Sequence, residues 1–129
     1  MEFEWIEVAT VAAIHSRQIA EHGGFSGIRD EGLLLSALAR PRNLFAYGND
    51  VDIAGLAPSY AFGIAKNHPF LDGNKRTAFT VGITFLNLNG FDFQAPESDT
   101  YTVFLGLAEG TVSEDELAEW FRQHLLLLK

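Results

Sequence analysis

The residues best suited to chemistry lie together in one short stretch, NHPFLDGNKRTAF, which spans residues 67–79. Lys75 and Arg76 place two cations at the expected start of a helix, where each opposes the helix dipole by roughly 0.3–1 kcal/mol. A bound anion would offset this repulsion, because free backbone N–H groups, the positive end of the dipole and two cations together form a phosphate site. The stretch therefore predicts phosphate binding on a chain whose formal net charge is −8.

The other polar residues of the stretch supply the groups that phosphate transfer needs. Histidine ordinarily titrates near neutrality, so His68 could remove a proton from an attacking hydroxyl. Asp72 offers a hard oxygen ligand for the Mg²⁺ that accompanies nucleotide phosphates. Gly73 can adopt a positive φ in the turn, and Asn74 is a favourable N-cap for the next helix. The alternative is a plain helix–turn–helix corner with solvated charges, which the clustering of so many special residues disfavours.

Composition limits the classes of protein to which the chain can belong. At 129 residues, a single domain over 1–129 is expected, and 47% hydrophobic residues argue against disorder. The absence of cysteine excludes a disulfide scaffold and a thiol nucleophile, and is consistent with a cytoplasmic location. The acidic net charge disfavours direct nucleic-acid binding. No apolar run approaches the ~20 residues of a membrane span, and no signal peptide is evident.

Helical periodicity and capping residues predict a compact all-α bundle of about six helices. Two of the expected helices, 52–67 and 75–89, are apolar all round and are therefore expected to be buried. The stretch around His68 connects these two helices, and Phe70 is expected to anchor it in the core. The other helices are expected at 10–22 with Thr10 as cap, at 30–40 ending before Pro41, at 97–109, and at 114–127 behind a capping box of Ser113 and Glu116.

The stretch HPFLDGNKRTA resembles the signature loop of the Fic/Doc superfamily, whose pattern is His-Pro-Phe-x-Asp/Glu-Gly-Asn-Gly/Lys-Arg. Among the branches of that family, the chain most resembles the death-on-curing (Doc) toxins of bacterial toxin–antitoxin pairs. The upstream stretch IRDEGLLLSALARP is similar to the same branch, and the resemblance spans most of the chain. It implies a Fic/Doc fold and an ATP-dependent transferase.

The resemblance also implies roles for the residues of the loop. His68 would be the general base on the target hydroxyl, and Asp72 would help to bind Mg²⁺ through the nucleotide. The phosphates would be held by the residues at the start of the helix, which are Gly73, Asn74, Lys75 and Arg76. The family target is a threonine of elongation factor Tu, whose modification arrests translation.

Two positions bear on which group would be transferred. Fic enzymes that transfer AMP have Gly at the place of Lys75 and a second Arg at the place of Phe79. The resemblance to Doc toxins therefore implies transfer of the γ-phosphate, as by a kinase. Two alternatives stay open, namely a transferase of AMP or another nucleotidyl group, and a catalytically silent binding module on the same fold.

The self-inhibiting helix motif of many Fic enzymes, Ser/Thr-x-x-x-Glu-Gly/Asn, is missing from the sequence. The two Glu-Gly pairs, at Glu31 and Glu109, are preceded four residues earlier by Gly27 and Leu105. Restraint would then come from a separate antitoxin protein.

A few other residues have less specific interpretations. His15 and His22 share a helix face and could bind a metal, but paired surface histidines are the favoured interpretation. Phe45 and Tyr47, in an expected loop over 42–50, form either a flap that docks the target or simple packing. The terminal LLLLK is expected to pack in the core in preference to forming a partner surface.

Overall fold

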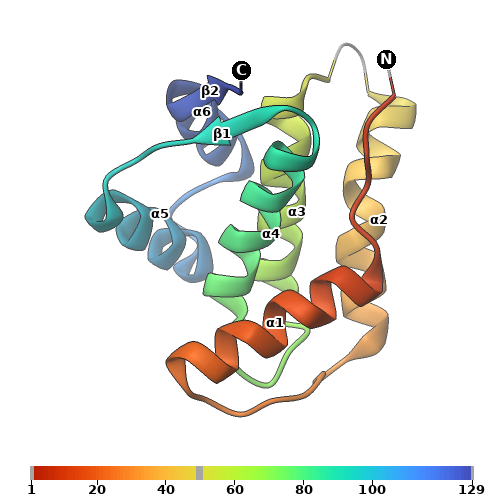
Figure 1. Ribbon diagram of the computed structural model, residues 1–129, viewed down its shortest axis with the longest axis vertical. Coiled ribbons are helices and arrows are strands. Elements are labelled where there is room, and N and C mark those ends of the chain that lie inside the picture. The colour runs from red at the N-terminus through yellow and green to blue at the C-terminus, as the bar shows by residue number, and fades with distance from the viewer. Residues whose placement is uncertain (1, 49–50, 129) are drawn as a thin grey trace.

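The computed structural model describes residues 2–48 and 51–128 and consists mainly of helices (Figure 1). This confirms the expected all-α class, with one small two-stranded sheet added. None of the helices in the described part of the chain is both long and apolar enough to cross a lipid bilayer. The elements in chain order are α1 (Val8–His22), α2 (Glu31–Tyr47), α3 (Ile53–Asn67), α4 (Asn74–Leu88), β1 (Phe91–Phe93), α5 (Glu97–Glu109), α6 (Glu114–His124) and β2 (Leu125–Leu127).

The core is built around α3 and α4, as their apolar sequences predict. α3 packs against α4, α2 and α6, and most of its side chains are buried. Gly63 permits the close approach of α2, because a Cβ atom there would lie 3.2 Å from the Cα atom of Ala37. α1 crosses the end of the α3–α4 pair where the loop between them lies (Figure 1). The central helices therefore present that loop at one end of the molecule.

Two predicted helix boundaries near the N-terminus are wrong. α1 begins at Val8 with Glu7 as its N-cap, so Thr10 lies inside the helix instead of capping it. α2 begins at Glu31, next to the predicted start, and its N-cap Asp30 accepts a side-chain hydrogen bond from the Leu33 backbone N–H. The helix does not stop before Pro41 as predicted but continues to Tyr47. Pro41 is buried on the helix face that packs into the core, and this burial outweighs the hydrogen bond that proline cannot donate.

The expected loop over 42–50 is therefore mostly helical, and the flap interpretation of Phe45 and Tyr47 is wrong. Phe45 packs edge-on against Phe3, with 5.3 Å between ring centroids, and Tyr47 ends α2 with its side chain 87% exposed. Both lie at the end of α2 far from the loop between α3 and α4 (Figure 1). Residues 49 and 50 of the expected loop lie outside the described part of the chain.

The C-terminal half follows the predicted capping signals until its last residues. α5 has the predicted bounds, Glu97–Glu109, and the capping box of Ser113 and Glu116 is formed. α6 ends at His124, and the following leucines form β2, which pairs antiparallel with β1 in the register Phe91 with Leu127. The prediction that the terminal leucines pack in the core is wrong except at Leu125, because the next three leucines are 44–73% exposed.

Candidate active site

The predicted loop residues line one pocket of about 520 Å³ at the N-terminus of α4. His68, Asp72 and the start of α4 with Lys75 and Arg76 line it on the loop side. The other lining residues are Phe79, one turn further along α4, and three residues of α5, namely Thr100, Tyr101 and Phe104. The pocket therefore brings together a histidine, a carboxylate and two cations, as the sequence predicted, and adds an aromatic wall that it did not.

His68 ends α3 in a strained conformation. Its φ and ψ are 48° and 55°, and it is the one non-glycine residue with a positive φ in the described ranges. Such a conformation costs of order 1–3 kcal/mol in most residues and concentrates at functional sites. Arg29 stabilises this strained backbone conformation, because its guanidinium donates hydrogen bonds of 2.7 Å to the His68 carbonyl and 2.9 Å to the Asn67 carbonyl. The imidazole is thus directed into the pocket by backbone that is held from outside the loop.

The segment before α2 braces the loop along its backbone. Arg29 and Asp30 donate backbone N–H bonds to the Pro69 carbonyl, and Leu71 donates one to the Gly27 carbonyl. These bonds form an isolated antiparallel bridge between Ile28 and Phe70. The loop is therefore hydrogen-bonded to a second chain segment, which limits its movement when a ligand binds.

Asn74 stabilises the loop through hydrogen bonds from its side chain to the backbone of Phe70. Its side-chain oxygen accepts from the Phe70 N–H and its amide donates to the Phe70 carbonyl, both at 3.0 Å, and the residue is 8% exposed. Gly73, with a φ of 74°, is the N-cap of α4, so the prediction that Asn74 is the cap is wrong. The side chain of Asn74 holds the turn, while its backbone N–H remains a candidate ligand for phosphate.

Asp72 is fixed by contacts on both its side chain and its backbone. One carboxylate oxygen accepts from the Gly73 N–H at 2.9 Å and the other from the Phe25 N–H at 3.2 Å. A Cβ atom on Gly24 would lie only 2.6 Å from that second oxygen. Glycine at this position therefore allows the α1–α2 connection to approach the carboxylate closely.

His15 of α1 is buried against the loop and is not a surface residue. It is 3% exposed, and its ring stacks on Phe70 with 3.8 Å between centroids and 6° between planes. Its Nε2 atom lies 2.8 Å from the Asp72 carbonyl oxygen. A carbonyl only accepts, so Nε2 carries the proton and donates. The interpretation of His15 and His22 as paired surface histidines is therefore wrong for His15.

Lys75 and Arg76 are exposed and have no carboxylate partner among the described residues. The other arginines are engaged, because four form ion pairs with acidic side chains and Arg29 binds backbone carbonyls. In the described ranges no acceptor is recorded for the backbone N–H groups of residues 74–76, and the first bond of α4 runs from Thr77 to Gly73. Free amides and uncompensated cations together suit an anion.

The residues present fit a Mg²⁺ ion that is bound mainly through nucleotide phosphates. Within residues 2–48 and 51–128, no group of three or more His, Cys, Asp or Glu side chains could hold a metal on its own. Asp72 is an exposed carboxylate in the same pocket as the two cations. One or two carboxylates plus phosphate oxygens and water form the usual environment of Mg²⁺ at nucleotide sites.

Several residues that shape the site were missed in the sequence. His15, Arg29 and Gly24 support the loop from segments more than 35 residues away in the chain, as the separations of 57 and 39 residues for the first two show. The one available signal was that the segment with Arg29 matched the same family as the loop. Thr100, which is half-buried, and Tyr101, which is exposed, carried no signal, because such residues are common on helices at a protein surface.

Comparisons with known proteins agree on one family. Residues 5–86 match the Fic/DOC family. The chain is 33% identical over 112 residues to "Protein kinase doc" of Escherichia phage P1, covering 86% of this chain and 87% of that protein. It is 41% identical over 75 residues to "Toxin Doc" of Mycolicibacterium smegmatis (strain ATCC 700084 / mc(2)155), covering 57% of each chain.

Proposed function

Because this chain belongs to the Fic/Doc family, on its Doc toxin branch, we propose that it transfers the γ-phosphate of Mg-ATP to a hydroxyl group of a protein. The observation that carries the proposal is the meeting of His68 with Lys75 and Arg76 in one pocket, where neither cation has a carboxylate partner among the described residues. A histidine beside an anion site is the arrangement that phosphoryl transfer to a hydroxyl requires.

In the proposed reaction, the hydroxyl oxygen of the target attacks the γ-phosphorus. The bond from that phosphorus to the β–γ bridging oxygen breaks, and ADP leaves. His68 accepts the hydroxyl proton, while Lys75, Arg76 and the free N–H groups of α4 neutralise charge on the phosphates. Asp72 would hold Mg²⁺ together with the phosphates, and the ion would supply further charge neutralisation.

The kinase chemistry is favoured over AMP transfer by two side chains. Lys75 occupies the position at which AMP-transferring relatives have Gly, and Phe79 stands where they have a second phosphate-binding Arg. The phage P1 relative bears the name of a protein kinase, which favours the same chemistry. A silent binding module is disfavoured because the strained His68 and the free cations would then have no purpose.

The family suggests the biological setting of this reaction. The proposed target is a threonine of elongation factor Tu, and the consequence would be arrest of translation in the cytoplasm. A separate antitoxin would restrain the enzyme, since no self-inhibiting motif is present in the sequence. A small antitoxin-like reading frame beside the gene would support this.

Growth on induction tests the proposal. The unmodified chain should arrest growth, and His68→Ala should not, because loss of a general base costs about 10²–10⁴ in rate. His22→Ala, which removes an exposed histidine at the end of α1, is the matched control and should still arrest growth. Arrest by a folded His68→Ala variant would remove His68 from the mechanism.

Ligand binding provides the test that does not depend on activity. Mg-ATP should raise the melting temperature of the purified chain by linkage, and Lys75→Ala should reduce this rise. A chain that neither arrests growth nor is stabilised by Mg-ATP would favour the silent module.

A further inference from the structure

Arg29 binds three successive backbone carbonyls around His68. Its guanidinium donates from Nη2 to the Asn67 carbonyl at 2.9 Å and from Nε to the His68 carbonyl at 2.7 Å. Its own backbone N–H donates to the Pro69 carbonyl at 2.7 Å. We propose that Arg29 is a positioning residue that sets the orientation of the His68 imidazole for proton removal, an inference that rests on the proposed function of His68.

The two side-chain bonds of Arg29 determine the backbone conformation of His68. Because each peptide group is rigid and planar, the Asn67 carbonyl follows the orientation of the peptide group before His68, and the His68 carbonyl follows that of the group after it. The φ and ψ angles of His68 describe the rotation between these two planes. A guanidinium that binds both carbonyls at once, from donors in a fixed fork, therefore restrains both angles.

The conformation that Arg29 stabilises is one that His68 would rarely adopt by itself. The left-handed region, at a φ of 48° and a ψ of 55°, is unfavourable for a residue with a side chain, and Pro69 favours an extended conformation in the residue before it. The cost of such a conformation lowers its population by about 5–150-fold. Without the guanidinium, we expect His68 to become extended, which redirects its Cα–Cβ bond and takes the imidazole out of the pocket.

The guanidinium of Arg29 is well placed for this role. Within residues 2–48 and 51–128 no carboxylate pairs with it, and its two recorded hydrogen bonds both end on carbonyls at the C-terminus of α3. A cation is favourable there because it faces the negative end of the helix dipole. The backbone of Arg29 is anchored as well, since the next residue, Asp30, is the N-cap of α2 and donates to the same Pro69 carbonyl.

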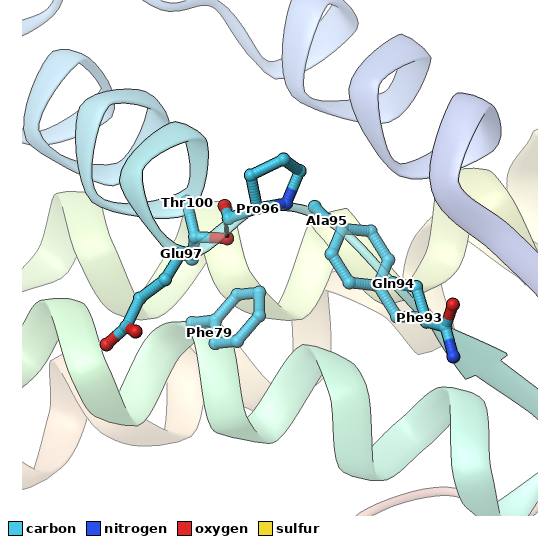
Figure 2. Close-up of a pocket in the computed structure, with 7 residues that line it drawn as sticks. All are labelled: Phe79, Phe93, Gln94, Ala95, Pro96, Glu97 and Thr100. Atoms are coloured by element: carbon cyan, nitrogen blue, oxygen red, sulfur yellow. Dashed lines mark hydrogen bonds between the residues drawn. The ribbon is translucent and has the colours of Figure 1, made fainter.

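The phosphate side of the loop pocket is stabilised by contacts that do not include Arg29. The Asn74 side chain binds the Phe70 backbone at the start of α4. Phe79, which also lines the loop pocket, packs edge-on against Phe93 with 5.8 Å between ring centroids (Figure 2). Loss of Arg29 should therefore lower kcat, which depends on the imidazole, much more than it changes the KM for ATP.

Transfer of the γ-phosphate from labelled Mg-ATP to elongation factor Tu, the proposed target, tests the role of Arg29. Arg29→Ala should lower kcat about 5–150-fold and leave the KM for ATP within about twofold. Arg29→Lys keeps the charge without the planar fork, so it should recover only part of the rate. Guanidinium ion at millimolar concentration should restore part of the kcat of Arg29→Ala, and urea at the same concentration should not. An unchanged kcat in Arg29→Ala would overturn the inference.

A double variant shows whether Arg29 acts through His68. His68→Ala removes the imidazole, so nothing remains for Arg29 to orient. Adding Arg29→Ala to this variant should therefore lower the residual kcat by less than about twofold. An equal fall in kcat with and without the imidazole would show that Arg29 acts in another way, and the inference would be wrong.

Arg122→Ala is the matched control. Arg122 also binds one end of α3, because it donates to the carboxylate of the N-cap Asp52 at 3.0 and 3.2 Å, but this is the end opposite His68. Its replacement should leave kcat unchanged. Melting curves confirm that each variant is folded.

The backbone chemical shifts of residue 68, measured by NMR, give a readout that needs no activity. They should indicate a left-handed conformation in the unmodified chain and an extended one in Arg29→Ala. A left-handed conformation retained in folded Arg29→Ala would overturn the inference, whatever the outcome for the proposed function. If the shifts change as expected but the unmodified chain transfers no phosphate, the proposed function is refuted, while Arg29 is confirmed as the residue that sets the conformation of His68.

Discussion

Replacing His15 by phenylalanine should slow the reaction although His15 does not line the catalytic pocket. The imidazole stacks on Phe70 and donates from Nε2 to the Asp72 carbonyl at 2.8 Å, so it holds two residues of the signature loop at once. His15→Phe keeps a flat ring for the stack and removes only the donor. The variant therefore isolates the hydrogen bond that sets the position of Asp72.

The magnitude follows from the contacts. A single hydrogen bond contributes about 0.5–1.5 kcal/mol, and Asp72 is exposed, so water can partly replace the lost donor. We expect a loss of about 1 kcal/mol, which lowers the melting temperature of a chain of this size by about 4 °C. His15→Ala removes the stack as well and leaves a cavity, so it should cost about 2–4 kcal/mol.

A matched variant separates positioning from stability. Ser113→Ala removes the side-chain cap of α6 and should also cost about 1 kcal/mol, but Ser113 does not line the loop pocket. Phosphate transfer measured well below both melting points should fall severalfold in kcat for His15→Phe and stay unchanged for Ser113→Ala. Equal transfer rates in the two variants would show that His15 is only structural. An unchanged melting temperature in His15→Phe would refute the energetic estimate.

Two further substitutions probe the loop. Gly24→Ala would place a Cβ atom 2.6 Å from the Asp72 carboxylate, so it should lower both the transfer rate and the melting temperature. Gly23 also has a positive φ, but a Cβ atom there would meet no atom within 4 Å, so Gly23→Ala should lower only the melting temperature. Initial rates and melting curves check this, and equal transfer rates in the two variants would contradict it. Lys75→Gly should weaken phosphate transfer without creating an efficient AMP transferase, because Phe79 supplies no second cation; mass analysis of the target distinguishes the two products, and efficient AMP attachment would contradict this expectation.

The fold was predictable where the signals are local. The bounds of α5 and the capping box of α6 follow from residues within a few positions of each helix end, and both were correct. Pro41 misled because its local preference is to end a helix, while its burial on the core face of α2 depends on packing that no local pattern contains. The terminal leucines misled for the same reason, since β1 was needed as a partner before a strand could form.

The same distinction between local signals and tertiary packing applies to the candidate site. His68, Asp72, Lys75 and Arg76 were found because their types and spacing within one stretch carry the chemistry, and the structure places them in one pocket. His15 was misread because a histidine on a helix shows nothing of its burial until α1 is placed across the loop. The distant residues that position a site are fixed by tertiary packing, so only the structure reveals them.

The central claim is that the γ-phosphate of ATP passes to a protein hydroxyl. The most direct test incubates the purified chain and its protein substrate with ATP labelled at either the γ- or the α-phosphate, in the presence of Mg²⁺. Label from the γ-phosphate should appear on the substrate with release of ADP, and label from the α-phosphate should not. Transfer of the α-label to the substrate by the unmodified chain would contradict the claim and establish nucleotidyl transfer in its place.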